Sequence, residues 1–246
     1  MANALKIGDT VYVPCSALPE LLEHDTALYK TKVVSLVKKS ITIKLPDGTE
    51  SAKIGSSRVH RDVGLLLIEI GDFLTEASTL DPLAKSVLQF CRLLVPDDQV
   101  RQVKVRSKAE LQQFWEKNEG AYSHVILVGH GDKELLAFAV DGDVKVPDVA
   151  ATFKKRKARP KLFISLACKT GFQSFGGELS KEAICKDFIG PFHSVHSAVA
   201  SQFCQTFLTS HFLDGKSTKV AFNHARDCVP GGVSFRLWHK GTMHAA

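Results

Sequence analysis

Three short, mainly apolar runs after residue 63 limit the folds that this chain can adopt. They cover residues 64–70, 125–128 and 162–166, and longer stretches with helical spacing of apolar residues separate them. A run of this kind suits a strand that is buried on both faces, as in a parallel sheet covered by helices. The sequence therefore predicts an α/β domain with a mainly parallel sheet.

The stretches between these runs carry signals for helices. Residues 81–82 are Asp-Pro, which offers an N-cap followed by proline at the first helical position. Residues 107–110 form a capping box that opens a second helix. Valine and phenylalanine recur every four residues from 195 to 207, which predicts a long helix, and another is expected from Ser217 to about Asp227.

The first 62 residues have a different pattern, typical of short strands. Residues 32–37 and 41–45 are rich in β-branched side chains, and Pro46-Asp47-Gly48 is a turn signal. The opening segment 6–13 resembles the first strand of SH3-like or Tudor-like barrels, which are binding modules of about this size. We therefore expect two domains, a small SH3-like β-barrel over residues 1–62 and an α/β domain over residues 63–246.

The composition narrows the class of protein. The 246 residues are 44% hydrophobic and 24% charged, as in ordinary globular proteins. No apolar run approaches the roughly 20 residues that cross a bilayer, and the segment 1–6 lacks the apolar core of a secretory signal. The six cysteines include no Cys-x-x-Cys pair, which favours a reducing, cytoplasmic location. A formal charge of +6 permits acidic partners but is weak evidence for nucleic-acid binding.

Reactive side chains follow two of the predicted strands. His130 comes after the run 125–128, and Cys168 comes after the run 162–166. Because catalysis in parallel sheets takes place at the carboxyl ends of strands, we expect this imidazole and thiol at one edge. A nearby imidazole can activate a thiol as a nucleophile. The backbone N–H groups of Gly131 and Cys168 are candidates to bind a developing oxyanion.

A histidine–glycine pair after one apolar strand and an alanine–cysteine pair after the next resemble the caspase-like cysteine peptidases of clan CD. The two residues are 38 positions apart, against roughly 50 in caspases. Leu166 stands where caspases have glutamine, and residues 169–170 precede the glycine. These departures argue against a preference for aspartate and favour the CHAT and separase-like branch. The resemblance covers residues 64 to 240.

The resemblance implies both a fold and a reaction. The fold would be a caspase-like, mainly parallel sheet flanked by helices. His130 would act as general base or acid, Cys168 would attack the peptide carbonyl to form a thioester, and no metal or cofactor would be required. Bacterial proteins of this kind often serve as antiviral defence or cell-death effectors, so a regulatory protein partner is expected beside the protein or peptide substrate.

Three acidic residues near the motifs are candidates for substrate binding. A preference for a basic residue before the scissile bond would need an acidic pocket, and Asp132, Glu178 and Asp187 are the nearest acids in sequence. Asp132 has an alternative role in capping the turn after His130. The glycine-rich segment 171–177 is expected to be a flexible loop that meets the substrate.

Other residues support less specific interpretations. His193 and His196 have no further ligand at a suitable spacing, so no metal site is expected. The basic run 154–159 is expected to be a solvated connection. Free cysteines are often buried, so the five outside the motif are expected to be small apolar fillers: Cys15, Cys91, Cys185, Cys204 and Cys228.

Two alternatives to a peptidase remain open at this stage. The first is a non-catalytic interaction protein that uses the peptidase-like domain and the barrel to bind a partner. The second is nucleic-acid binding through the basic barrel, which would be sensitive to salt. No interaction with a membrane is expected.

Overall fold

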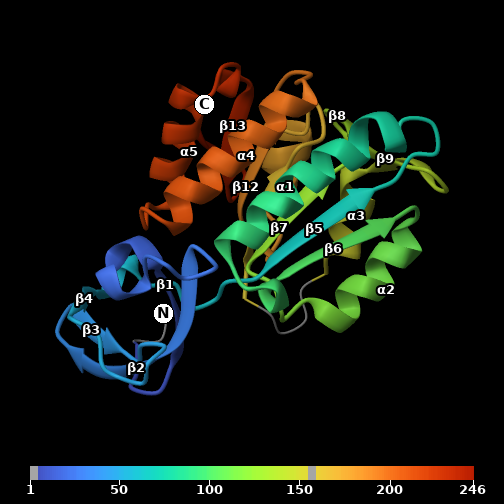
Figure 1. Ribbon diagram of the computed structural model, residues 1–246. Coiled ribbons are helices and arrows are strands. Elements are labelled where there is room, and N and C mark those ends of the chain that lie inside the picture. The colour runs from blue at the N-terminus through green and yellow to red at the C-terminus, as the bar shows by residue number, and fades with distance from the viewer. Residues whose placement is uncertain (1–4, 155–158) are drawn as a thin grey trace.

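The computed structural model describes residues 5–154 and 159–246, arranged as a small N-terminal unit beside a larger α/β unit (Figure 1). The first four residues lie outside the described parts, and the expectation that no secretory signal is present rests partly on them. Most of the basic run, residues 155–158, also lies outside the described parts. In the described residues, no helix is long and apolar enough to cross a membrane.

The N-terminal unit is a four-stranded antiparallel sheet with its own apolar core. Its strands, in sheet order, are β1 (Thr10–Pro14), β2 (Leu28–Val37), β3 (Ser40–Ile43) and β4 (Ile54–Gly55). The predicted turn at Pro46-Asp47-Gly48 is confirmed, with Gly48 at φ 87°. Among the described strands, β1 pairs only with β2 and β4 only with β3, so closure into an SH3-like barrel is not confirmed. The domain boundary at residues 62 and 63 stays a prediction.

The larger unit is built on a seven-stranded sheet. In sheet order its strands are β14 (Thr242–Ala245), β13 (Phe235–His239), β12 (Cys185–Pro191), β11 (Lys161–Ser165), β7 (His124–Val128), β5 (Leu65–Ile70) and β6 (Val100–Val105). The five strands from β12 to β6 are parallel, whereas β13 pairs antiparallel with β12 and β14 pairs antiparallel with β13. The predicted α/β architecture with a largely parallel sheet is confirmed.

Helices cover both faces of this sheet (Figure 1). On one face lie α1 (Asp81–Leu94), α4 (Ser197–Phe212) and α5 (Thr218–Cys228), and on the other lie α2 (Lys108–Asn118) and α3 (Val146–Thr152). Side chains of β5 alternate between the two cores, with Leu65 and Leu67 in one and Leu66 and Ile68 in the other. Two buried faces explain why the strand positions are continuously apolar.

Two of the helix starts differ from the predicted pattern. The Ser107 side chain accepts a hydrogen bond from the Glu110 N–H, as predicted, but the Glu110 carboxylate accepts from Arg106 N–H instead of closing a reciprocal capping box. Asp81 lies inside α1 and is not its N-cap. The reason is a π-helical turn, Glu76–Leu80, which precedes α1 and continues into it.

A small antiparallel sheet lies beyond the carboxyl end of β7. It has the order β10 (Gly142–Lys145), β9 (Leu135–Phe138), β8 (His130–Asp132). No pattern in the sequence predicted this sheet. It places His130 and Gly131 on a strand that pairs with β9, which fixes their backbone beside the edge of the central sheet.

Candidate active site

The strands that precede His130 and Cys168 end at the same level of the sheet. Strands β7 and β11 are parallel neighbours, and Ser165 lies opposite Leu127 in the register. The Leu166 N–H donates to the Leu127 carbonyl oxygen at 2.8 Å, which continues the alignment past the end of β11. His130 and Cys168 each follow within three residues, so both lie at the carboxyl edge of the sheet.

Gly131 lies directly against the turn that carries Cys168. A Cβ atom at Gly131 would lie 3.2 Å from the Cys168 carbonyl oxygen, 3.1 Å from Ala167 Cβ and 3.0 Å from Thr170 Cγ2. A side chain at this position would press on the Cys168 turn, and glycine fits there without displacing it. This close approach brings the His130–Gly131 segment into contact with the Cys168 turn.

Cys168 is half-buried, and its thiol contacts a backbone carbonyl. Its Sγ lies 3.8 Å from the Val195 carbonyl oxygen. Between the His130 ring and this Sγ the described residues show no hydrogen bond, a common state of catalytic pairs without substrate. In residues 5–154 and 159–246, the Cys168 backbone N–H donates to no other backbone group.

The turn after Cys168 is held in a costly conformation. Lys169 has φ 59°, in the left-handed region that costs a non-glycine residue roughly 1–3 kcal/mol. Its N–H donates to the His193 carbonyl oxygen at 3.3 Å. The Thr170 hydroxyl lies 2.8 Å from both Ser165 Oγ and the Ala167 carbonyl oxygen. These contacts fix the direction in which the chain presents Cys168.

The segment 171–177 is packed and does not form the flexible loop that was expected. A Cβ atom at Gly171 would overlap the Gly190 carbonyl oxygen, so this backbone runs tightly along β12. The Trp238 indole N–H donates to the Gly171 carbonyl oxygen at 2.8 Å. Phe172 stacks on Phe192 with ring centroids 4.0 Å apart. Apolar packing against β12 and β13 therefore orders this segment.

Two residues that were not among the predicted site residues lie against the His130 ring. Its Nε2 lies 2.5 Å from the Thr75 hydroxyl oxygen and 3.7 Å from Asp72 Oδ2. Both residues belong to the segment between β5 and α1, and β5 is the other sheet neighbour of β7. The rule that functional groups gather at the carboxyl ends of parallel strands was the available signal, because Asp72 and Thr75 follow β5.

Of the three acids expected to bind substrate, Asp132 lies beside the Cys168 turn. Its Oδ1 is 3.3 Å from the Lys169 ammonium, and both side chains are nearly half exposed. A hydrogen bond from the Lys133 N–H, followed by the contact with Lys169, lowers the pKa of Asp132. The Asp132 carboxylate is thus ionised and forms an ion pair with Lys169, the residue after Cys168.

The other two acids lie elsewhere. Glu178 pairs with Lys181 at 2.6 Å and lines a cavity of about 450 Å³ together with Glu134 and Ser174. Asp187 is buried in the first half of β12, where its Oδ1 lies 2.7 Å from His239 Nδ1. The carboxyl end of β12 faces the candidate site, so Asp187 is not brought together with Cys168.

One group of carboxylates resembles a metal site in its ligand types. Oxygen atoms of Glu69, Glu76 and Asp81 lie within 4.8 Å of one another. The Lys104 ammonium lies 3.0, 2.6 and 2.6 Å from these carboxylates. Burial raises the pKa of Glu69. Burial alone would lower the pKa of Lys104, but its hydrogen bonds to the three acids raise it. The lysine supplies the positive charge, and the group is a salt-bridge network.

The remaining cysteines fall into two classes. The filler role is confirmed for four buried residues, Cys15, Cys91, Cys185 and Cys204. Burial raises the pKa of Cys15 to about 11 and that of Cys91 to about 12. The same expectation is wrong for Cys228, which is exposed in the last turn of α5 with Sγ 3.6 Å from His224 Nδ1.

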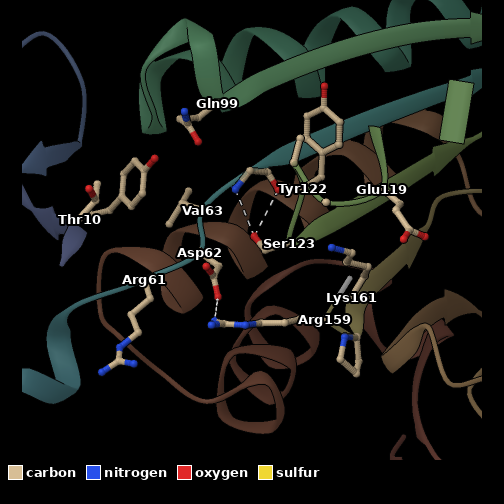
Figure 2. A pocket seen from close by; sticks show the side chains of 15 residues that line it. Thr10, Arg61, Asp62, Val63, Gln99, Glu119, Tyr122, Ser123, Arg159 and Lys161 are labelled. Atoms are coloured by element: carbon tan, nitrogen blue, oxygen red, sulfur yellow. Dashed lines mark hydrogen bonds and ion pairs between the residues drawn. The ribbon is translucent and has the colours of Figure 1, made fainter. Parts of the chain in front are cut away.

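A cavity of about 640 Å³ lies at the other end of the parallel strands, between the two units (Figure 2). Tyr12 of the N-terminal unit and Ser123, just before β7, both line it. Asp62 and Arg159 form an ion pair across it, and Ser123 hydrogen-bonds the Gly64 backbone. Its lining residues do not include the candidate pair.

Comparison with protein-family models gives no match, and comparison with curated proteins gives none either. Among solved structures, the chain is similar to a secreted C11 cysteine protease from Bacteroides thetaiotaomicron, determined in complex with an irreversible peptide inhibitor. The identity is 12% and the TM-score 0.48, and the match covers 68% of this chain and 58% of that one. The chain thus spans less than two thirds of that structure's length, and this likeness carries no inference about activity.

Proposed function

We propose that the protein is a cysteine endopeptidase with Cys168 as nucleophile and His130 as general base and acid. The observation that carries the proposal is the contact of Gly131 with the Cys168 turn at the carboxyl edge of the sheet. Through this contact, a half-exposed imidazole and the thiol of a half-buried cysteine lie on one edge of the sheet, each after one of two neighbouring parallel strands. Such an edge is where α/β proteins place their reactive groups.

The reaction would proceed through a thioester. Cys168 Sγ attacks the peptide carbonyl carbon while His130 takes the thiol proton, and the Cys168 and Gly131 N–H groups receive the oxyanion. His130 then gives this proton to the leaving amine, and the acyl group stays on sulfur. In the second half, His130 takes a proton from water, and the water oxygen attacks the thioester carbon. The C–S bond then breaks, the acid leaves, and His130 returns the proton to the Cys168 sulfur.

Finer parts of the proposal concern the class of peptidase and its biological role. We assign it to the caspase-like, CHAT-related peptidases on the strength of the residues around His130 and Cys168. The N-terminal unit, with its own sheet and core, would be an SH3-like module that recruits a regulator or substrate. Control by such a partner would suit a bacterial defence or cell-death effector.

The test is cleavage of a protein-derived peptide pool by the full chain, read by mass spectrometry. We expect new termini with wild type and a loss of at least about 1,000-fold in rate with Cys168→Ala and with His130→Ala. Cys228→Ala is the matched control, because it removes the other accessible thiol. Equal cleavage by wild type and Cys168→Ala would overturn the proposal.

One observation favours a second candidate, a non-catalytic interaction protein. Among the described residues, the His130 ring and Cys168 Sγ share no hydrogen bond. A peptidase-like domain that has lost catalysis would bind its partner with the same affinity after Cys168→Ala. It would give no new termini with any peptide.

A further inference from the structure

A four-residue segment after β5 is folded around one carboxylate. Asp72 Oδ1 accepts a hydrogen bond from the Leu74 N–H at 3.2 Å, and Asp72 Oδ2 accepts from the Thr75 hydroxyl at 2.8 Å. This is the side-chain-to-backbone pattern by which aspartate builds turns. The turn directs the Thr75 oxygen to His130 Nε2, 2.5 Å away and 55 positions later in the chain.

The hydrogen-bond pattern determines where the proton of the His130 ring resides. Hydrogen bonds from the Thr75 hydroxyl and the Leu74 N–H lower the pKa of Asp72, so its carboxylate is ionised at neutral pH and can only accept. The single hydroxyl proton of Thr75 therefore goes to Asp72. The Thr75 oxygen must then accept from His130, which places the ring proton on Nε2 and leaves Nδ1 bare.

The segment is also anchored on its far side. The Glu76 N–H donates to the Asp72 carbonyl oxygen at 3.0 Å, and the Glu76 carboxylate lies 2.6 Å from the Lys104 ammonium and 2.9 Å from the Arg106 guanidinium. Lys104 is on β6, and Arg106 directly follows it. The Thr75 hydroxyl is thus fixed relative to the central sheet, as orienting a ring requires.

We propose that Thr75 and Asp72 are positioning residues for His130: they keep Nε2 protonated and leave Nδ1 as the nitrogen that takes the Cys168 proton. This inference rests on the peptidase function proposed above. When Nδ1 takes that proton, the ring becomes positive, and the Asp72 carboxylate at 3.7 Å stabilises the charge. Neither residue is required to touch the substrate, so their loss should lower kcat and leave KM largely unchanged.

The experiment measures alkylation of Cys168 by iodoacetamide across pH 5–9 in the full chain, read by mass spectrometry. It needs no substrate. We expect His130→Ala to slow the reaction at neutral pH, and Thr75→Val to slow it by about tenfold or more, toward the His130→Ala level. Thr75→Ser keeps the hydroxyl and should restore the rate to within about threefold of wild type. Asp72→Asn should shift the pH profile.

The chain supplies two controls. Asp47 and Thr49 make the same hydroxyl–carboxylate hydrogen bond, at 2.7 Å, in a turn of the N-terminal unit. Thr49→Val is therefore a matched substitution that should leave the Cys168 rate unchanged. Within every sample, labelling of the exposed Cys228 shows that the reagent is active, and the buried Cys204 should stay unlabelled as long as the chain is folded.

The outcomes separate this inference from the proposed function. If His130→Ala leaves the Cys168 rate and pH profile unchanged, the Cys–His pair itself is refuted. If His130→Ala slows the reaction but Thr75→Val matches wild type, only the positioning role is refuted. If Thr75→Val melts at a clearly lower temperature than wild type, its alkylation rate no longer tests the positioning role. The test is then the pH profile of Cys168 alkylation in Asp72→Asn, and a profile equal to that of wild type overturns the inference.

Discussion

The chain has two accessible cysteines with a histidine nearby, and they lie in very different surroundings. On α5, Cys228 Sγ is 3.6 Å from His224 Nδ1, a contact that follows from the i, i+4 spacing of any helix. At the sheet edge, Cys168 and His130 make no hydrogen bond to each other among the described residues. The pair with the direct contact is the weaker candidate for catalysis, so proximity alone does not identify a site.

The difference lies in what holds each imidazole and what faces each thiol. In the described residues, His224 has no hydrogen bond besides the one to Cys228, and so nothing sets its tautomer. His130 is held by Thr75, which is itself held by Asp72. A thiol becomes a catalyst when a fixed base, an oxyanion site and room for a substrate surround it.

The largest predicted effect is selective labelling by a peptide reagent. A peptidyl chloromethyl ketone should modify Cys168 at least about 1,000-fold faster than Cys228, because binding places its carbonyl at the Cys168 site. Iodoacetamide, which has no peptide to bind, should give a far smaller ratio. Mass spectrometry of both cysteines in one digest measures both ratios. Similar ratios for the two reagents would show that Cys168 is no more than an accessible thiol.

How far the sequence predicts this molecule depends on the range of each contact. Apolar runs with two buried faces indicate strands such as β7 and β11, and His130 and Cys168 follow the ends of these two strands. The β8–β10 sheet was missed because its strands have three or four residues, too few for a periodic pattern. Thr75 was missed because its role depends on a contact across 55 positions.

A second expected effect sets the lowest pH at which Cys168 and Cys228 can be compared in the folded chain. Three imidazoles, His60, His124 and His211, gather where the two units meet, and their ring centroids lie 5.3 Å (His124–His211) and 6.1 Å (His60–His211) apart. The His60 ring hydrogen-bonds the Phe212 carbonyl oxygen at 2.8 Å. Burial lowers the pKa of all three, that of His211 to about 4.

In the unfolded chain a histidine has a pKa of about 6.5. Below that pH the unfolded chain therefore binds more protons at these histidines than the folded chain does. The free energy of unfolding should therefore fall from pH 6.5 to 4, by up to about 3 kcal/mol for His211, and its contribution should be constant above pH 7. Urea unfolding at several pH values measures this. His211→Phe should flatten the curve and His244→Phe should not; parallel curves for wild type and His211→Phe would contradict the assignment. Once the chain unfolds, Cys168 and Cys228 should react alike.

The smallest predicted effect asks whether Cys168 has an acidic subsite that Cys228 lacks. Lys169 covers Asp132 at 3.3 Å, and an exposed pair of this kind contributes at most about 1 kcal/mol. Lys169→Met should therefore free Asp132 and raise kcat/KM two- to fivefold for peptides with lysine or arginine before the cleaved bond, relative to alanine. Methionine at φ 59° has the same backbone cost as lysine, so the turn itself should not change. Lys181→Met uncovers Glu178 in the same way and is the matched control. An equal gain in the control would mean that added negative charge in general, and not Asp132, attracts the basic side chain.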